Sequence, residues 1–137
     1  MAHVVLERRR RCLVSIEAAL VFPLLLLLTL GLMELGWMIL KSHQIANAAR
    51  NGARIGVRID ATNADVQQAV DSLMAAAGMA DSGYAVTLVP ADVSQMNGGE
   101  QLTVTLTVLY ENIDLGMPLV PTPTALEASV TMAKEGF

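Results

Sequence analysis

The sequence predicts an α+β fold, in which a long N-terminal transmembrane helix extends into a small head made of a second helix and a three-stranded antiparallel sheet. An unbroken apolar run covers residues 13–40. In the last third of the chain, apolar and polar residues alternate with the period of two that is typical of half-buried strands. Between these regions, apolar residues recur at steps of three and four, which indicates helices.

The apolar run has no polar face. Helices that are apolar all round are either buried in large proteins or lie in membranes, and a chain of 137 residues is too short to bury so long a helix. About 20 apolar residues span a hydrocarbon layer of about 30 Å. The two charges of the run, Glu17 and Glu34, lie near its ends, about 25 Å apart along a helix. We therefore expect one membrane span, kinked by Pro23.

The charge distribution predicts the topology. Arg8–Arg11 precede the apolar run, and the positive-inside rule places such a basic segment in the cytoplasm. We expect residues 1–12 to be a basic cytoplasmic leader, residues 13–40 the transmembrane half of the helix, and residues 41–137 an extracytoplasmic domain. After Ile59 the chain has ten acidic residues and only one basic residue, Lys134, which argues against nucleic-acid binding. With Cys12 as the only cysteine, the head has no disulfide.

A cleaved secretory signal is the main alternative for the N-terminal segment. Its apolar region would cover about 7–15 residues, and the present run is longer. An A-x-A pattern occurs at residues 46–48, but it lies inside a stretch that reads as continuous helix. A membrane span is the better interpretation.

The head is predicted to contain two helical segments. The first, residues 41–58, continues the membrane helix without a break and has an apolar face that includes Ile45, Ala48 and Gly52. The second covers residues 64–77, capped by Thr62 or Asn63 and ended by Gly78.

Three strands are expected at about residues 84–89, 101–110 and 125–133, with a hairpin turn at residues 97–99. The link between the last two strands contains Pro118, Pro121 and Pro123, which exclude regular structure. This apolar link is either tucked under the sheet, which we favour, or offered to a partner.

No arrangement of residues predicts catalysis. His3 and His43 fall on opposite sides of the membrane in this topology, so they cannot share a metal or a proton relay. Metalloprotease, thiol, nucleophile-elbow and phosphate-loop motifs do not occur. We expect a protein that is not an enzyme and that has no cofactor and no metal.

Two glutamates of the membrane helix are candidate contacts with other subunits. Glu17 either reaches the headgroups or has a partner in an assembly. Glu34 is costly if it faces lipid, which suggests that it is paired in an assembly.

Two patterns above the membrane are further candidates for subunit contacts. Gly52 and Gly56 have the spacing that lets helices approach closely, although the same spacing allows a helix to pack on its own domain. Arg50, Arg54 and Arg58 form a basic ridge, which is either a contact surface or a solvated face.

Several motifs occur together in one order. They are the basic leader, Glu17, the Pro-Leu-Leu run from Pro23, the Glu-Leu-Gly segment at residues 34–36, and AN-AAR-NGAR at residues 46–54. This order resembles the TadE-like family of minor pseudopilins, from the tight-adherence (Flp-type) branch of type IV pilus systems. The similarity is most specific over residues 11–56. The alternating segment 102–110 and the ending 126–135 also resemble the family.

The resemblance implies a pilin-like fold and processing by a prepilin peptidase. Cleavage would follow Cys12, making Leu13 the first residue and Glu17 the fifth, which is the family's glutamate position. Cys12 replaces the family's glycine, and Ala18 replaces its aromatic residue.

The implied role is a minor pilin or pseudopilin that supports pilus biogenesis and surface adhesion. Its partners would be the membrane, other pilins or pseudopilins, the pilus assembly platform and the prepilin peptidase. The implied location is the bacterial cytoplasmic (inner) membrane, from which the subunit can enter an extracellular pilus. The alternative is a single-pass adaptor or sensor with an extracytoplasmic binding domain.

Overall fold

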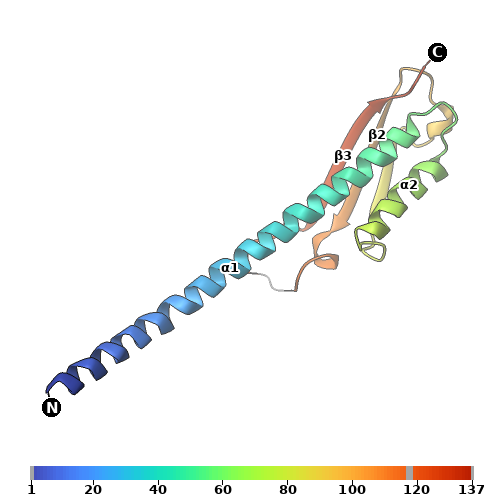
Figure 1. The fold of residues 1–137 in the computed structure, drawn as a ribbon. Coiled ribbons are helices and arrows are strands. Elements are labelled where there is room, and N and C mark those ends of the chain that lie inside the picture. The colour runs from blue at the N-terminus through green and yellow to red at the C-terminus, as the bar shows by residue number, and fades with distance from the viewer. Residues whose placement is uncertain (1, 117–118, 137) are drawn as a thin grey trace.

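The computed structural model describes residues 2–116 and 119–136, and it describes side chains from Glu17 onward. One helix, α1 (Ala2–Gly56), runs the length of the molecule and carries the head on its C-terminal half (Figure 1). The predicted α+β fold is confirmed. The other elements of the head are the helix α2 (Asn63–Ala76), the strands β1 (Ala85–Val89), β2 (Gln101–Leu109) and β3 (Ala125–Ala133), and the short 3-10 turns η1 (Val93–Gln95) and η2 (Tyr110–Asn112).

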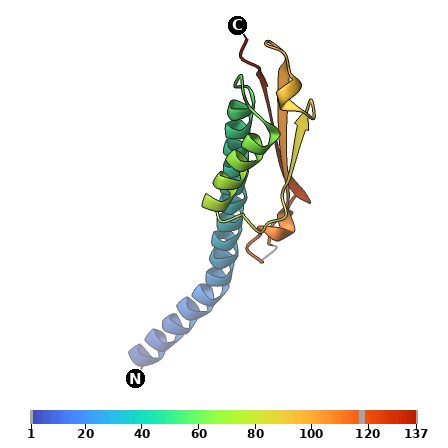
Figure 2. The same cartoon turned by 90° about the vertical axis from the view of Figure 1, so that its right-hand side faces the viewer.

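Helix α1 is longer at its start than expected. It begins at Ala2 rather than at Leu13, because the basic leader contains no glycine or proline that would break a helix. It ends at Gly56, slightly before the predicted end at Arg58, since the Arg58 amide bonds the Ile55 carbonyl in a tighter turn. Pro23 lies inside α1, and Figure 2 shows the N-terminal part of the helix bending away from the line of its upper half.

The sheet has the order β1-β2-β3, with both neighbouring pairs antiparallel. Figure 2 shows α1 and α2 together on one face of this sheet. That face carries alternate residues of the central strand β2, and all of them are fully buried: Leu102, Val104, Leu106 and Val108. The opposite face carries hydroxyls that bond across strands, such as Thr103 and Thr131, whose Oγ1 atoms are 2.8 Å apart.

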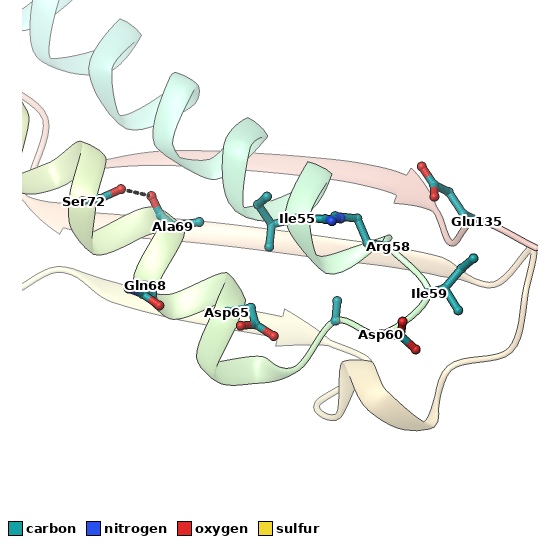
Figure 3. Close-up of a pocket in the computed structure, with 10 residues that line it drawn as sticks. Ile55, Arg58, Ile59, Asp60, Asp65, Gln68, Ala69, Ser72 and Glu135 are labelled. Carbon is teal, nitrogen blue, oxygen red and sulfur yellow. Dashed lines mark hydrogen bonds between the residues drawn. The ribbon is translucent and has the colours of Figure 1, made fainter.

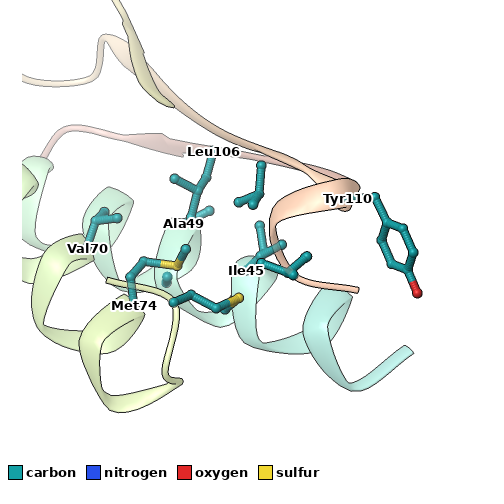
Figure 4. Packing of buried hydrophobic residues seen from close by; sticks show 10 residues of the cluster. Ile45, Ala49, Val70, Met74, Leu106 and Tyr110 are labelled. Atoms are coloured by element: carbon teal, nitrogen blue, oxygen red, sulfur yellow. The ribbon is translucent and has the colours of Figure 1, made fainter. Parts of the chain in front are cut away.

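The core fills the space between the helices and the sheet. One cluster includes Ile45 and Ala49 of α1, Val70 and Met74 of α2, and Leu106 of β2 (Figure 4). The second cluster lies nearer the C-terminal end of α1, around Ala53, Val66, Val93 and Leu102. Small residues of α1 face both clusters, so the helix lies close to its neighbours.

Local signals fix both ends of α2. Thr62 is the N-cap: its Oγ1 accepts from the Asp65 amide, and the Asp65 carboxylate accepts from the Thr62 amide at 2.9 Å. Asn63, the other candidate cap, instead accepts from the Val93 amide through its side-chain oxygen. Gly78, at a φ of +68°, ends the helix, and the Gly78 and Met79 amides bond back to Ala75 and Met74 in a Schellman motif.

The connection from β1 to β2 is longer than a simple hairpin. The predicted turn forms at its end, where the Glu100 amide bonds the Asn97 carbonyl and Gly99 has a φ of +87°. Residues 90–96, which include η1, precede that turn. After β3, the Glu135 amide bonds the Val57 carbonyl at 2.9 Å, which ties the C-terminal segment to the end of α1.

The close approach at Gly56 generates a prediction. A Cβ there would lie 2.4 Å from Leu102 Cδ2 and 2.9 Å from Val66 Cγ2, whereas a Cβ at Gly36 would meet nothing within 4 Å. We expect Gly56→Ala to destabilise the head by about 1–3 kcal/mol through overpacking, partly offset by the gain in helix propensity of about 1 kcal/mol.

The matched control is Gly36→Ala, which carries the same propensity gain without the clash. Thermal unfolding of the full chain in detergent, followed by near-UV circular dichroism, measures both variants. Equal midpoints for the two variants would contradict the packing explanation.

Candidate functional site

The part of α1 below the head exposes a long aliphatic surface. The residues 17–56 form one helix that is long and apolar enough to cross a membrane. Its exposed side chains include Leu20, Phe22, Leu24, Leu28 and Leu32. Glu17 is also exposed, at the first described side chain. The side chains of Cys12 and Leu13 lie outside the described residues, although their backbone belongs to α1.

Glu34 is buried by the link that follows β2. Its side chain is 4% exposed, and its Oε2 accepts hydrogen bonds from the amides of Leu119, at 3.0 Å, and Val120, at 3.1 Å. Bonds between a carboxylate and backbone amides are charge-assisted, and they are strong where water is excluded. Glu34 thus has two partners in its own chain, and a contact of Glu34 with another subunit stays a prediction.

Trp37 and Lys41 continue the same face of α1. Trp37 Nε1 donates to the Ile113 carbonyl at 2.7 Å. Lys41 Nζ donates to the Ala77 carbonyl at 2.9 Å and lies 4.7 Å from the centre of the Trp37 ring. Ala77 is the C-cap of α2, where a cation compensates the partial negative charge of the carbonyls. We call Glu34, Trp37 and Lys41 the anchor face.

The anchor face decides where the proline-rich link lies. The described part of the link lies against its own chain: residues 113 and 119–120 are bonded to α1, and Ile113 belongs to the core. The reason is that the Glu34 carboxylate accepts hydrogen bonds from the Leu119 and Val120 amides, which are not part of a strand. Met117 and Pro118 lie outside the described residues.

Gly52 and Gly56 pack within the head. Both are buried, and a Cβ on Gly52 would lie 2.8 Å from Val70 Cγ2 of α2. The structure shows the alternative given for this spacing, packing of the helix on its own domain, and a subunit contact at these glycines stays a prediction. Their spacing serves contacts with α2 and β2.

The basic ridge, by contrast, stays on the surface: Arg50, Arg54 and Arg58 are all exposed. Arg58 also borders a cleft of about 700 Å³ between the end of α1 and α2, which is lined by Asp60, Asp65 and Glu135 among others (Figure 3). Hydrogen bonds from the Thr62 side chain and backbone lower the pKa of Asp65, and the charge of Arg58 adds to this effect. Positive and negative groups thus lie side by side at this end of the head.

Comparison with protein families gives one match. Residues 13–54 match the family model described as TadE-like protein. Over this segment, which is less than a third of the chain, the protein is similar to TadE-like proteins. The match supports, in general terms, a minor pilin-like protein associated with the tight-adherence pilus. No curated protein and no solved structure matches the chain.

The match agrees with the structural division of α1. The TadE-like segment begins at the proposed cleavage position and ends in the buried upper half of α1. This family is structural and non-enzymatic. Within residues 17–116 and 119–136, no three histidine, cysteine, aspartate or glutamate side chains are grouped so that they could hold a metal ion.

Sequence reasoning missed the anchor face as a unit. The spacing of positions 34, 37 and 41 is the signal that could have found it, since residues three and four apart share one face of a helix.

The Glu34 bonds generate a prediction. Glu34→Ala leaves the Leu119 and Val120 amides without their acceptor, at a cost of about 1–3 kcal/mol for each buried group. We expect faster amide hydrogen exchange at both residues in the full chain, with a smaller effect for Glu34→Gln, which keeps an acceptor oxygen.

The matched control is Glu111→Ala, because Glu111 is an exposed carboxylate of η2. Its exchange at Leu119 and Val120 should equal that of the unsubstituted chain. Unchanged exchange in Glu34→Ala would show that the carboxylate does not hold the link.

Proposed function

We propose that this TadE-like chain is a minor pilin or pseudopilin, a structural or assembly subunit of a tight-adherence type IV pilus that supports pilus biogenesis and surface adhesion. One observation carries the proposal. A single helix, TadE-like over residues 13–54, exposes an aliphatic lower half while its upper half is the core of a small head. Such a subunit can be stored in a membrane and can also pack its lower half against neighbouring helices.

In this proposal the chain lies in the bacterial cytoplasmic membrane. Residues 1–12 are the cytoplasmic leader, residues 13–40 span the membrane, and residues 41–137 lie outside. A prepilin peptidase removes the leader after Cys12, and the processed chain meets other pilins and the assembly platform. The work of the protein is assembly, not catalysis.

Glu17 has a defined role if the leader is removed. The new amino terminus at Leu13 lies four residues, one helical turn, from Glu17. The exposed Glu17 carboxylate can then pair with the amino terminus of an adjacent subunit. A buried charge without its partner costs several kcal/mol, so this pair would fix the register between subunits.

We expect mass spectrometry of the mature protein to give an N-terminus at Leu13. Glu17→Ala should abolish assembly into pili while membrane insertion is unchanged, because insertion depends on the apolar residues. Glu7→Ala, which removes a carboxylate from the leader, is the control and should assemble normally. Normal pili from Glu17→Ala would contradict the role of Glu17, and a mature start at Met1 would favour the single-pass adaptor or sensor.

The basic ridge is the second proposed subunit contact. Arg50, Arg54 and Arg58 are exposed on α1, whereas the remainder of the head is acidic. Complementary charges of this kind orient partners and weaken with added salt.

We therefore expect that reversal of all three arginines to glutamate reduces crosslinking between subunits, and that high salt has the same effect on the unsubstituted protein. Thermal unfolding of the monomer is the control, because it measures separately the loss of the attraction between Arg58 and Asp65. Unchanged crosslinking under both conditions would identify the ridge as a solvated face.

A further inference from the structure

An apolar groove lies beside the anchor face. It has a volume of about 440 Å³ and is lined by Leu27, Leu28, Gly31, Leu32, Leu35, Leu119 and Val120. Gly31 provides part of the space, since a Cβ there would come within 3.7 Å of Val120 Cγ2. Leu119 remains 45% exposed. The groove therefore joins a membrane helix to two residues of a loop that follows β2.

The position of the groove along α1 gives its depth. If the membrane span begins at Glu17, the rise of about 1.5 Å per residue places Trp37 about 30 Å away, which equals the hydrocarbon thickness. Gly31 then lies about 9 Å inside the boundary on the head's side. Trp37 and Lys41 fall at that boundary, where tryptophan and lysine are favoured.

Two backbone amides beside the groove are hydrogen-bonded in a way that suits this depth. A loop backbone is tolerated at membrane depth only where its hydrogen bonds are made within the protein. The amides of Leu119 and Val120 both donate to Glu34, and the next residue, Pro121, has no amide hydrogen. The same bonds remove the buried carboxylate from contact with lipid.

We propose that Leu119 and Val120 enter the lipid layer on the head's side of the membrane and that the groove holds a lipid acyl chain. Continuity identifies this occupant: Leu27, Leu28, Leu32 and Leu35 belong both to the groove and to the exposed surface of the membrane span. Among the residues that the structure describes, none that lines the groove is charged, so a charged ligand would find no countercharge there. These contacts fix the distance between the head and the membrane surface.

Fluorescence of a labelled loop tests this inference. The full chain with Cys12→Ser and Leu119→Cys carries an environment-sensitive label and is reconstituted in phosphatidylcholine vesicles at low protein-to-lipid ratio. The matched control is Val89→Cys, because Val89 is an aliphatic residue, 60% exposed, in the edge strand β1. We expect a blue-shifted emission and several-fold stronger quenching by brominated acyl chains at position 119 than at position 89.

Two further arms keep the test decisive. Adding Glu34→Ala should shift the label at position 119 toward the aqueous emission, because the two amides lose their acceptor. Trp37 emission checks that each variant keeps the fold. A label at position 119 that aqueous iodide quenches as strongly as the label at position 89 would overturn the inference.

A second outcome would also overturn the inference. In it, neither iodide nor brominated chains quench the label, and this shielding rises with the protein-to-lipid ratio. A second protein helix would then occupy the groove. The inference depends on the membrane span and not on pilus assembly. A negative result in the Glu17 and leader experiments therefore does not contradict this inference. A negative result in the fluorescence experiment does not contradict the proposed pilus function.

Discussion

The head depends on the close approach of α1 to α2 and β2. Ala48, Ala49 and Ala53 are fully buried, and Gly52 and Gly56 lie where a Cβ would meet side chains of Val70 and Leu102. This seam brings the helix backbone close to its neighbours, so that a small domain with few aromatic residues forms a dense core. Because the seam is used within the chain, the exposed side of the upper half of α1 is its polar side, which includes the basic ridge.

The anchor face is the second constraint, and it joins the membrane half to the head. Glu34, Trp37 and Lys41 bond the link, the Ile113 carbonyl and the end of α2. Without such bonds, the head could rotate about the axis of α1. These bonds fix the side of α1 on which the head lies. They also give the two charged residues near the membrane boundary partners within the chain, which reduces the cost of their position.

The sequence was sufficient for elements that depend on local patterns. The period of two defined the strands, and Thr62 and Gly78 gave the ends of α2 because capping is decided within a few residues. It was not sufficient for contacts between distant segments. The Glu34 carboxylate accepts hydrogen bonds from amides that lie 85 and 86 residues further along the chain. The small residues at positions 52 and 56 have the same spacing whether a helix packs within its own chain or against another chain. Only the folded head distinguishes these possibilities.

The difference between the two membrane glutamates has a consequence for assembly. The hydrogen-bond partners of Glu34 belong to its own chain. Its environment therefore stays the same whether α1 is surrounded by lipid or by other helices. The aliphatic surface between the glutamates also suits both surroundings, since lipid chains and leucine side chains are equally apolar. The Glu17 side chain, by contrast, is exposed and is not covered by another described segment of the chain. In the proposed assembly, the free energy of the exposed carboxylate therefore changes more than that of Glu34 when a neighbouring subunit replaces the membrane, and the proposed register between subunits would be set at Glu17.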